Sequence, residues 1–221
     1  AADVAATPAL ERHPAAISDG QGGAFVVFEF EPTAGEHKGD VDIVAQRLAG
    51  DGRLMWTEPH DVGTAPGLER NPVAVSDGVG GVIAAFEYEP VAGDNAGDID
   101  ILAQRLSPDG QMLWNEGKRS VTVSTSKRLE RTPHGLATAN GGAIFVLESE
   151  PRDGERAGDV DLLAQRLNPD GTMAWEKGEH SVTVSNSKWL EGGAVVLPGG
   201  ASGAIVVFTM TGPKGEFEGD Q

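Results

Sequence analysis

The order of apolar and polar residues predicts short β-strands along the chain. The run VIAAFEYEP, residues 82–90, is apolar at its start and alternating at its end, which is typical of a strand that becomes less buried along its length. In the run DIDILAQRL, residues 98–106, apolar side chains fall on both faces, so both faces require cover. The turn sequences GVGG and SPDG adjoin these runs. We therefore expect strands that are joined by tight turns and buried between layers.

Two further segments complete a unit of about four strands. The piece VAVSD, residues 73–77, precedes the GVGG turn, and SVTVS, residues 120–124, is rich in β-branched residues. Between SPDG and SVTVS the chain returns through QMLW, residues 111–114. The unit is interpreted as a small antiparallel sheet.

This unit recurs along the chain. Copies of LER or LEG begin 58, 61 and 61 residues apart, at Leu10, Leu68, Leu129 and Leu190. The AQRL motif and the tryptophans Trp56, Trp114 and Trp175 keep the first two of these steps. We expect one repeat domain, 1–221, with units at about 10–67, 68–128 and 129–189 and an incomplete unit at 190–221. Residues 1–9 are expected to form a closing outer strand.

A repeat of this length with a doubly buried middle predicts an all-β fold, a β-propeller or partial propeller of about 3.5 to 4 four-stranded antiparallel blades. The incomplete last unit leaves three explanations open. The chain is a piece of a longer one, a second chain supplies the missing strands, or four blades close imperfectly.

The repeated motifs SDGxGGAxVVFE, DxDIxAQRL and DGxxxW resemble those of β-propeller-like repeat proteins that are secreted by bacteria or lie on their surface. The resemblance covers nearly the whole chain. Phe28 and Phe86 stand where such repeats often have Trp. The resemblance implies a propeller fold and an exported setting, and it implies no reaction, because the family has no common catalytic site.

The charge of the chain narrows the classes of partner. With 17 Lys and Arg against 34 Asp and Glu, the net charge of -17 disfavours nucleic acid and anionic lipid. No apolar run is long enough for a transmembrane helix, and the chain has no cysteine. The opening residues AADVAAT are typical of a chain cut by signal peptidase. We expect an extracellular, cell-surface or periplasmic bacterial protein.

Carboxylates recur at one end of every predicted sheet, and ion pairing between blades is the preferred interpretation. The predicted pairs join Arg12, Arg70 and Arg131 to Glu29, Glu87 and Glu148. The fourth copy supports pairing, because Gly192 replaces the arginine where Thr209 and Thr211 replace both glutamates. Loss of one partner alone would leave a charge uncompensated.

Two chemical alternatives are weighed for the same carboxylates. Calcium would take the oxygen ligands of Asp94, Asn95, Asp98 and Asp100, although no EF-hand loop is present. Glu87 and Glu89 would lie about 7 Å apart on one strand face, a separation that suits glycoside hydrolysis. That pair recurs in three copies, however, whereas catalysis requires one asymmetric site.

The function predicted from these features is a non-enzymatic scaffold or protein-interaction module without a cofactor. Its partner would be another protein or a second copy that completes the ring. The alternative is a calcium- or glycan-binding propeller that accompanies a catalytic domain. Trp189 departs from the repeat, since the preceding copy has Arg128 at that place, and is a candidate contact residue.

Overall fold

The regular elements of the chain are almost all β-strands, as the sequence predicts. The structure is a computed structural model and describes residues 3–5, 7–35, 37–152, 154, 156–178, 180–200 and 203–212. Within these residues the other elements are two short 3₁₀ helices, Asn115–Gly117 and Glu176–Gly178. No helix in the described part of the chain is long and apolar enough to cross a membrane.

The strands form four antiparallel sheets in the described residues, one for each repeat. Sheet 1 contains β1 (Ala9–Ser18), β2 (Ala24–Pro32), β3 (Asp42–Leu48) and β4 (His60–Gly63). Sheet 2 contains β5 (Leu68–Ser76), β6 (Val82–Glu89), β7 (Asp100–Leu106) and β8 (Val121–Ser124). Sheet 3 contains β9 (Arg128–Ala137), β10 (Ala143–Pro151), β11 (Asp161–Leu167) and β12 (Val182–Ser185). Sheet 4 pairs β13 (Leu190–Pro198) with β14 (Ala204–Thr211).

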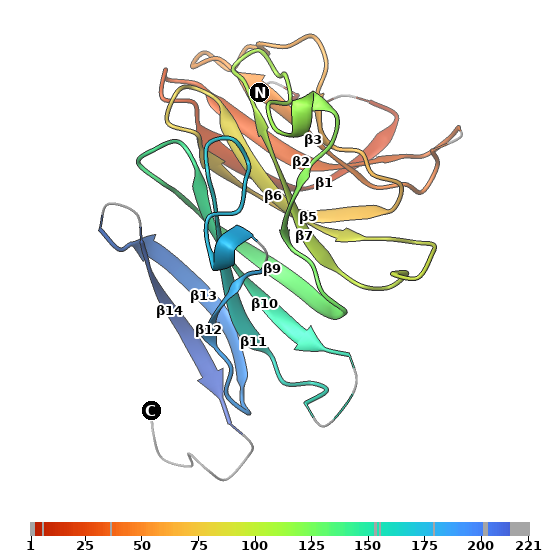
Figure 1. The fold of residues 1–221 in the computed structure, drawn as a ribbon. Coiled ribbons are helices and arrows are strands. Elements are labelled where there is room, and N and C mark those ends of the chain that lie inside the picture. Colours follow the sequence, from red (N-terminus) through yellow and green to blue (C-terminus); the bar gives the residue numbers. More distant parts are fainter. Residues whose placement is uncertain are drawn as a thin grey trace.

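The sheets follow one another as propeller-like blades, from red to blue in Figure 1. We call the face of a sheet that looks toward the next sheet in the chain its forward face, and the opposite one its backward face. The forward face of sheet 1, with Phe25 and Val27, packs on the backward face of sheet 2, with Ala84 and Phe86. Sheets 2 and 3 pack in the same way. Apolar burial between successive faces therefore supplies the core.

Each first strand carries a bulge where the pairing with its neighbour shifts register. The residues at the bulge have positive φ: His13, Asn71, Thr132 and Gly193. The LER motif lies inside the strand on one side of this bulge, so β5 begins at Leu68 and not at the predicted residue 73. The bulge leaves a backbone N–H without a ladder partner, and that group needs an acceptor.

One turn of sheet 2 and one turn of sheet 3 are each held by side chains of the preceding sheet. Trp56 Nε1 and Arg47 Nη1, both from sheet 1, donate to the carbonyl oxygen of Pro108 at 3.2 and 3.1 Å. Trp114 and Arg105 of sheet 2 donate in the same way to Pro169. The repeated tryptophans therefore serve packing between blades.

Two details differ from the sequence-based expectation. The segment QMLW forms only an isolated bridge, Leu106 to Met112, before the 3₁₀ helix. At the N-terminus β1 begins at Ala9, and the described residues before it form no strand. Asp3, Val4 and Ala5 instead line a cavity beside sheet 1.

Candidate functional site

The predicted ion pairs lie opposite one another in the strand register but are not the contacts that form. Arg12 faces Glu29, Arg70 faces Glu87 and Arg131 faces Glu148. Arg12 Nη2 instead lies 3.1 Å from Glu31, and Arg70 Nη1 lies 4.0 Å from Glu89. These two pairs are partly exposed, so each contributes little to stability.

The glutamates of the predicted pairs are occupied by the next sheet. Glu29, Glu87 and Glu148 accept the free bulge N–H of Asn71, Thr132 and Gly193 at 2.9, 2.8 and 3.3 Å. These contacts agree with the prediction that carboxylates join the blades. The predicted arginines, however, are not the groups that these carboxylates bind. Glu87 also accepts from Asn71 Nδ2, which leaves it poorly placed to act with Glu89 as a catalytic pair.

A second row of carboxylates points in the opposite direction. Glu69, Glu130 and Glu191, the glutamates of the LER and LEG motifs, are buried against the preceding sheet. Glu69 accepts hydrogen bonds from the backbone of Ile43 and Ala65 at 3.2 and 3.0 Å. Each junction between sheets thus contains carboxylates from both sides.

The pKa values of this row differ with the hydrogen-bond donors around each carboxyl group. Burial raises the pKa of Glu69 to about 8, although two backbone N–H groups donate to this carboxyl group and act to lower its pKa. Burial raises that of Glu130 only to about 7, because Ser126 and Ser124 donate to it. At Glu191 burial also acts to raise the pKa, but hydrogen bonds from Ser185 and Ser187 outweigh it and the pKa is lowered.

Gly63 accounts for the missing hydroxyl at Glu69. It occupies the place of Ser124 and Ser185, and a Cβ there would lie 2.4 Å from the Phe86 ring and 2.5 Å from the Glu69 carboxylate. The large Phe86 ring therefore excludes a serine at this junction.

The deeply buried ion pairs were not predicted. Arg47 lies 2.8 Å from Asp19, and Arg105 lies 2.9 Å from Asp77, with both carboxylates almost fully buried. Each pair joins the AQRL motif to the glycine turn between the first two strands. The repeat spacing contains this signal, because the arginine and aspartate recur together in the first two copies.

The calcium candidates have other surroundings. Asp98 pairs with Arg152 at 2.5 Å, and burial raises the pKa of Asp100. Among the described residues, no group of three or more His, Asp or Glu side chains is arranged to hold a metal ion. Asp94 and Asn95 lie exposed in the loop before β7.

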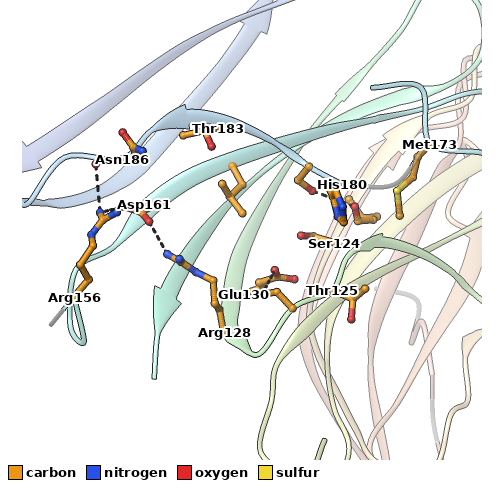
Figure 2. A pocket seen from close by; sticks show the side chains of 14 residues that line it. Ser124, Thr125, Arg128, Glu130, Arg156, Asp161, Met173, His180, Thr183 and Asn186 are labelled. Carbon is orange, nitrogen blue, oxygen red and sulfur yellow. Dashed lines mark hydrogen bonds and ion pairs between the residues drawn. The ribbon is translucent and has the colours of Figure 1, made fainter. Parts of the chain in front are cut away.

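A pocket of about 270 Å³ lies between sheets 2 and 3 (Figure 2). Glu130 from β9 and Asp161 from β11 line it together with Arg128 and Arg156. Arg128 lies 2.5 Å and Arg156 lies 2.6 Å from the two oxygens of Asp161, so two guanidinium groups stabilise its charge. Glu130 Oε1 accepts from Ser126 at 2.8 Å, whereas the buried Oε2 has no hydrogen-bond partner.

The two arginines belong to the third copy of the repeat. The residues at the equivalent positions are Ala9, Gly67 and Trp189 for Arg128, and His37 and Asn95 for Arg156. The space between sheets 1 and 2 holds Glu69 in a cavity of about 730 Å³ with a different lining that includes Tyr88 and Arg119. The repeat symmetry is therefore broken at the pocket of Glu130. The criterion that singled out Trp189, departure from the repeat, would also have found Arg128. Trp189 itself is half-buried and lies outside the pocket lining.

Comparison with solved structures supports the propeller-like fold. A protein of unknown function from Dyadobacter fermentans superposes with a TM-score of 0.55 and 13% identity, over 93% of this chain and 63% of that one. An endo-arabinase from Bacteroides thetaiotaomicron gives 0.48 and 15%, over 90% and 72%. A levansucrase from B. megaterium gives 0.45 and 14%, over 74% and 48%. No family model matches the chain, and no curated protein matches its sequence.

These comparisons correct the expectation about function. Two of the three structures are named as enzymes, which contradicts the prediction of a non-enzymatic scaffold and leaves the accessory-domain alternative without better support. At 13% identity and a TM-score of 0.55, the similarity to the Dyadobacter fermentans protein establishes the fold alone, and the chemistry rests on the pocket.

Proposed function

We propose that this chain is part of an enzyme that cleaves or transfers glycosidic bonds in the pocket between sheets 2 and 3. The observation that carries the proposal is the pairing of two unlike carboxyl groups at one junction. Glu130 has a pKa raised to about 7 by burial, whereas Asp161 forms ion pairs with two arginines. Environments that separate two carboxyl groups in this way allow one to act as an acid and the other as a stabilising charge.

Glu130 is assigned the role of general acid. Its proton passes to the leaving glycosidic oxygen as the bond from that oxygen to the anomeric carbon breaks. The charge of Asp161 stabilises the positive charge that develops on the sugar ring. Water or a sugar hydroxyl then adds to the anomeric carbon and returns a proton to Glu130, so the enzyme ends in its starting state.

The lining of the pocket suits a hydroxylated ligand. Figure 2 shows polar side chains from β8, β9 and β12 around the carboxyl groups, and the hydroxyl and amide groups belong to Ser124, Thr125, Ser126, Ser181, Thr183 and Asn186. Such groups both donate to and accept from sugar hydroxyls. Because Glu130 is fully buried, a substrate reaches Oε2 only when the groups that cover it move aside.

The test is loss of activity in Glu130→Gln. Wild type is screened for release of aryl groups from chromogenic glycosides and of reducing ends from soluble polysaccharides. Once an active substrate is identified, kcat of the variant is expected to fall at least about 100-fold, because the Gln amide cannot act as a general acid. Glu191→Gln is the matched control, since it alters the same repeat position outside the pocket. A fully active Glu130→Gln, or a wild type that acts on no glycan, would contradict the proposal.

The pH profile of Ser124→Ala gives an independent measurement. Ser124 donates to Glu130 and lowers its pKa, so its removal is expected to raise that pKa. A general acid is active when protonated, and the alkaline limb of the kcat/KM profile should therefore move to higher pH. An unchanged alkaline limb would show that Glu130 is not the group that titrates.

A further inference from the structure

The forward face of sheet 4, which is the face opposite the one that packs on sheet 3, exposes a row of apolar side chains. On β13, Val195 and Leu197 are 54% and 47% exposed, and on β14, Ile205 and Val207 are 54% and 55% exposed. Val195 pairs with Val207 and Leu197 with Ile205 across the two strands, so the four side chains form one patch. Contiguous apolar surface of this kind marks an interaction site.

The same positions are buried in the preceding sheets. Phe25, Ile83 and Ile144 correspond to Ile205, and each is 0% exposed. In sheets 1 and 2 these positions lie under the backward face of the following sheet. The exposed patch thus has the composition of a face that receives another sheet.

The backward face of sheet 1 has retained the features of a face between sheets. Val26 and Phe28 line a cavity of about 280 Å³ together with Val4 and Pro14. Glu11 Oε1 accepts from Thr7 Oγ1 at 2.6 Å, which repeats the contact of Ser126 with Glu130 four residues apart. In the later copies this glutamate is buried against a preceding sheet. The backward face of sheet 1 therefore resembles a face that packs against a preceding sheet.

We propose that the forward face of sheet 4 binds the backward face of sheet 1 of a second copy of this chain. The contact is heterologous, because two different faces of the same molecule meet. Apolar residues meet apolar residues, as at the junctions inside the chain. This proposal does not depend on the enzymatic proposal above.

The polar contacts indicate a reversible association. Inside the chain a carboxylate of the preceding sheet accepts the bulge N–H, as Glu87 does from Thr132. In sheet 4 the residue equivalent to Glu87 is Thr209, whose hydroxyl donates to the carbonyl of Gly192. A hydroxyl oxygen is a weaker acceptor than a carboxylate for the bulge of His13 in the second copy. Two chains of charge -17 also repel, so added salt is expected to strengthen the contact.

Sedimentation equilibrium over a concentration series tests the proposal. Wild type is expected to change reversibly from 23.0 kDa to twice that mass or more as concentration rises, and to do so at lower concentration in higher salt. Val207→Lys on the forward face and Val26→Lys on the backward face should each remain monomeric. Val79→Lys, in a turn away from both faces, is the control and should associate like wild type. Thermal melting monitors the folding of every variant.

Mixing the two monomeric variants gives the decisive result. The Val207→Lys copy keeps an intact backward face and the Val26→Lys copy an intact forward face, so an equimolar mixture is expected to form a one-to-one dimer. Association of Val26→Lys by itself would show that two forward faces meet and would overturn the proposal. A wild type that stays monomeric at every concentration would overturn it as well.

Discussion

At the scale of single residues, Asp19 and Asp77 each neutralise an arginine that the fold buries. Asp77 also accepts the backbone N–H groups of Val79 and Gly81, so one carboxylate shapes the glycine turn and holds Arg105. The third copy has Thr138 at this place, and its Oγ1 accepts only the turn N–H of Gly142. The turn therefore survives without the carboxylate, and the ion pair is a separate contribution.

Replacing Asp77 by Thr, the residue of the third copy, should separate these two roles. The turn should persist, but Arg105 would lose its counter-charge, and the expected loss of unfolding free energy is about 3 to 5 kcal/mol. Glu89→Gln, which breaks the exposed contact with Arg70, should cost less than about 1 kcal/mol. Urea denaturation of the two variants measures both values, and equal effects would refute the assignment.

At the scale of elements, the strands and their order were predictable because period-2 alternation and turn residues recur in register with the repeat. The bulge was not predictable, because the apolar pattern does not indicate which residue has a positive φ. The bulge changed the ion pairs, because its partly buried N–H needs an acceptor and bonds to Glu87, whereas Arg70 contacts the partly exposed Glu89. The pocket was missed for a related reason. Arg128 and Arg156 lie 28 residues apart, and only the sheet brings them to Asp161.

The bulge residues themselves provide a test. Thr132 has φ of 54°, where a β-branched residue is strained, whereas Asn71 at φ of 51° tolerates the conformation. Both side chains bond the glutamate beside them, Thr132 to Glu148 and Asn71 to Glu87. We expect Thr132→Asn to stabilise the chain by about 0.5 to 1 kcal/mol and Asn71→Thr to destabilise it by a similar amount. Opposite shifts in melting temperature would bear this out, and shifts of the same sign would not.

At the scale of the whole molecule, buried carboxyl groups at successive junctions link stability to pH. Glu69 and Glu130 are fully buried, and burial raises their pKa to about 8 and about 7. The folded state therefore holds these protons more tightly than the unfolded state does above the ordinary carboxyl pKa. The stabilisation is fully present below that value and is lost as pH rises through the folded pKa values.

Unfolding free energy is accordingly expected to fall from about pH 5 to pH 8, by up to about 1.4 kcal/mol per pH unit for each of the two groups. Urea denaturation at unit pH intervals measures the slope. The double variant with Glu69→Gln and Glu130→Gln should show a much flatter profile. Stability that rises over this range in wild type would contradict the assignment.

The tryptophans that cross from one sheet to the next give the molecule its own optical reporters. Trp56 belongs to sheet 1 and Trp114 to sheet 2, yet each indole N–H is bonded to a proline carbonyl of the following sheet. Parting of either junction would break that bond and expose the ring to water, which alters its emission. With the other tryptophans replaced by Phe, fluorescence of the remaining one would follow the opening of a single junction, so the order in which the blades separate can be observed without an added dye.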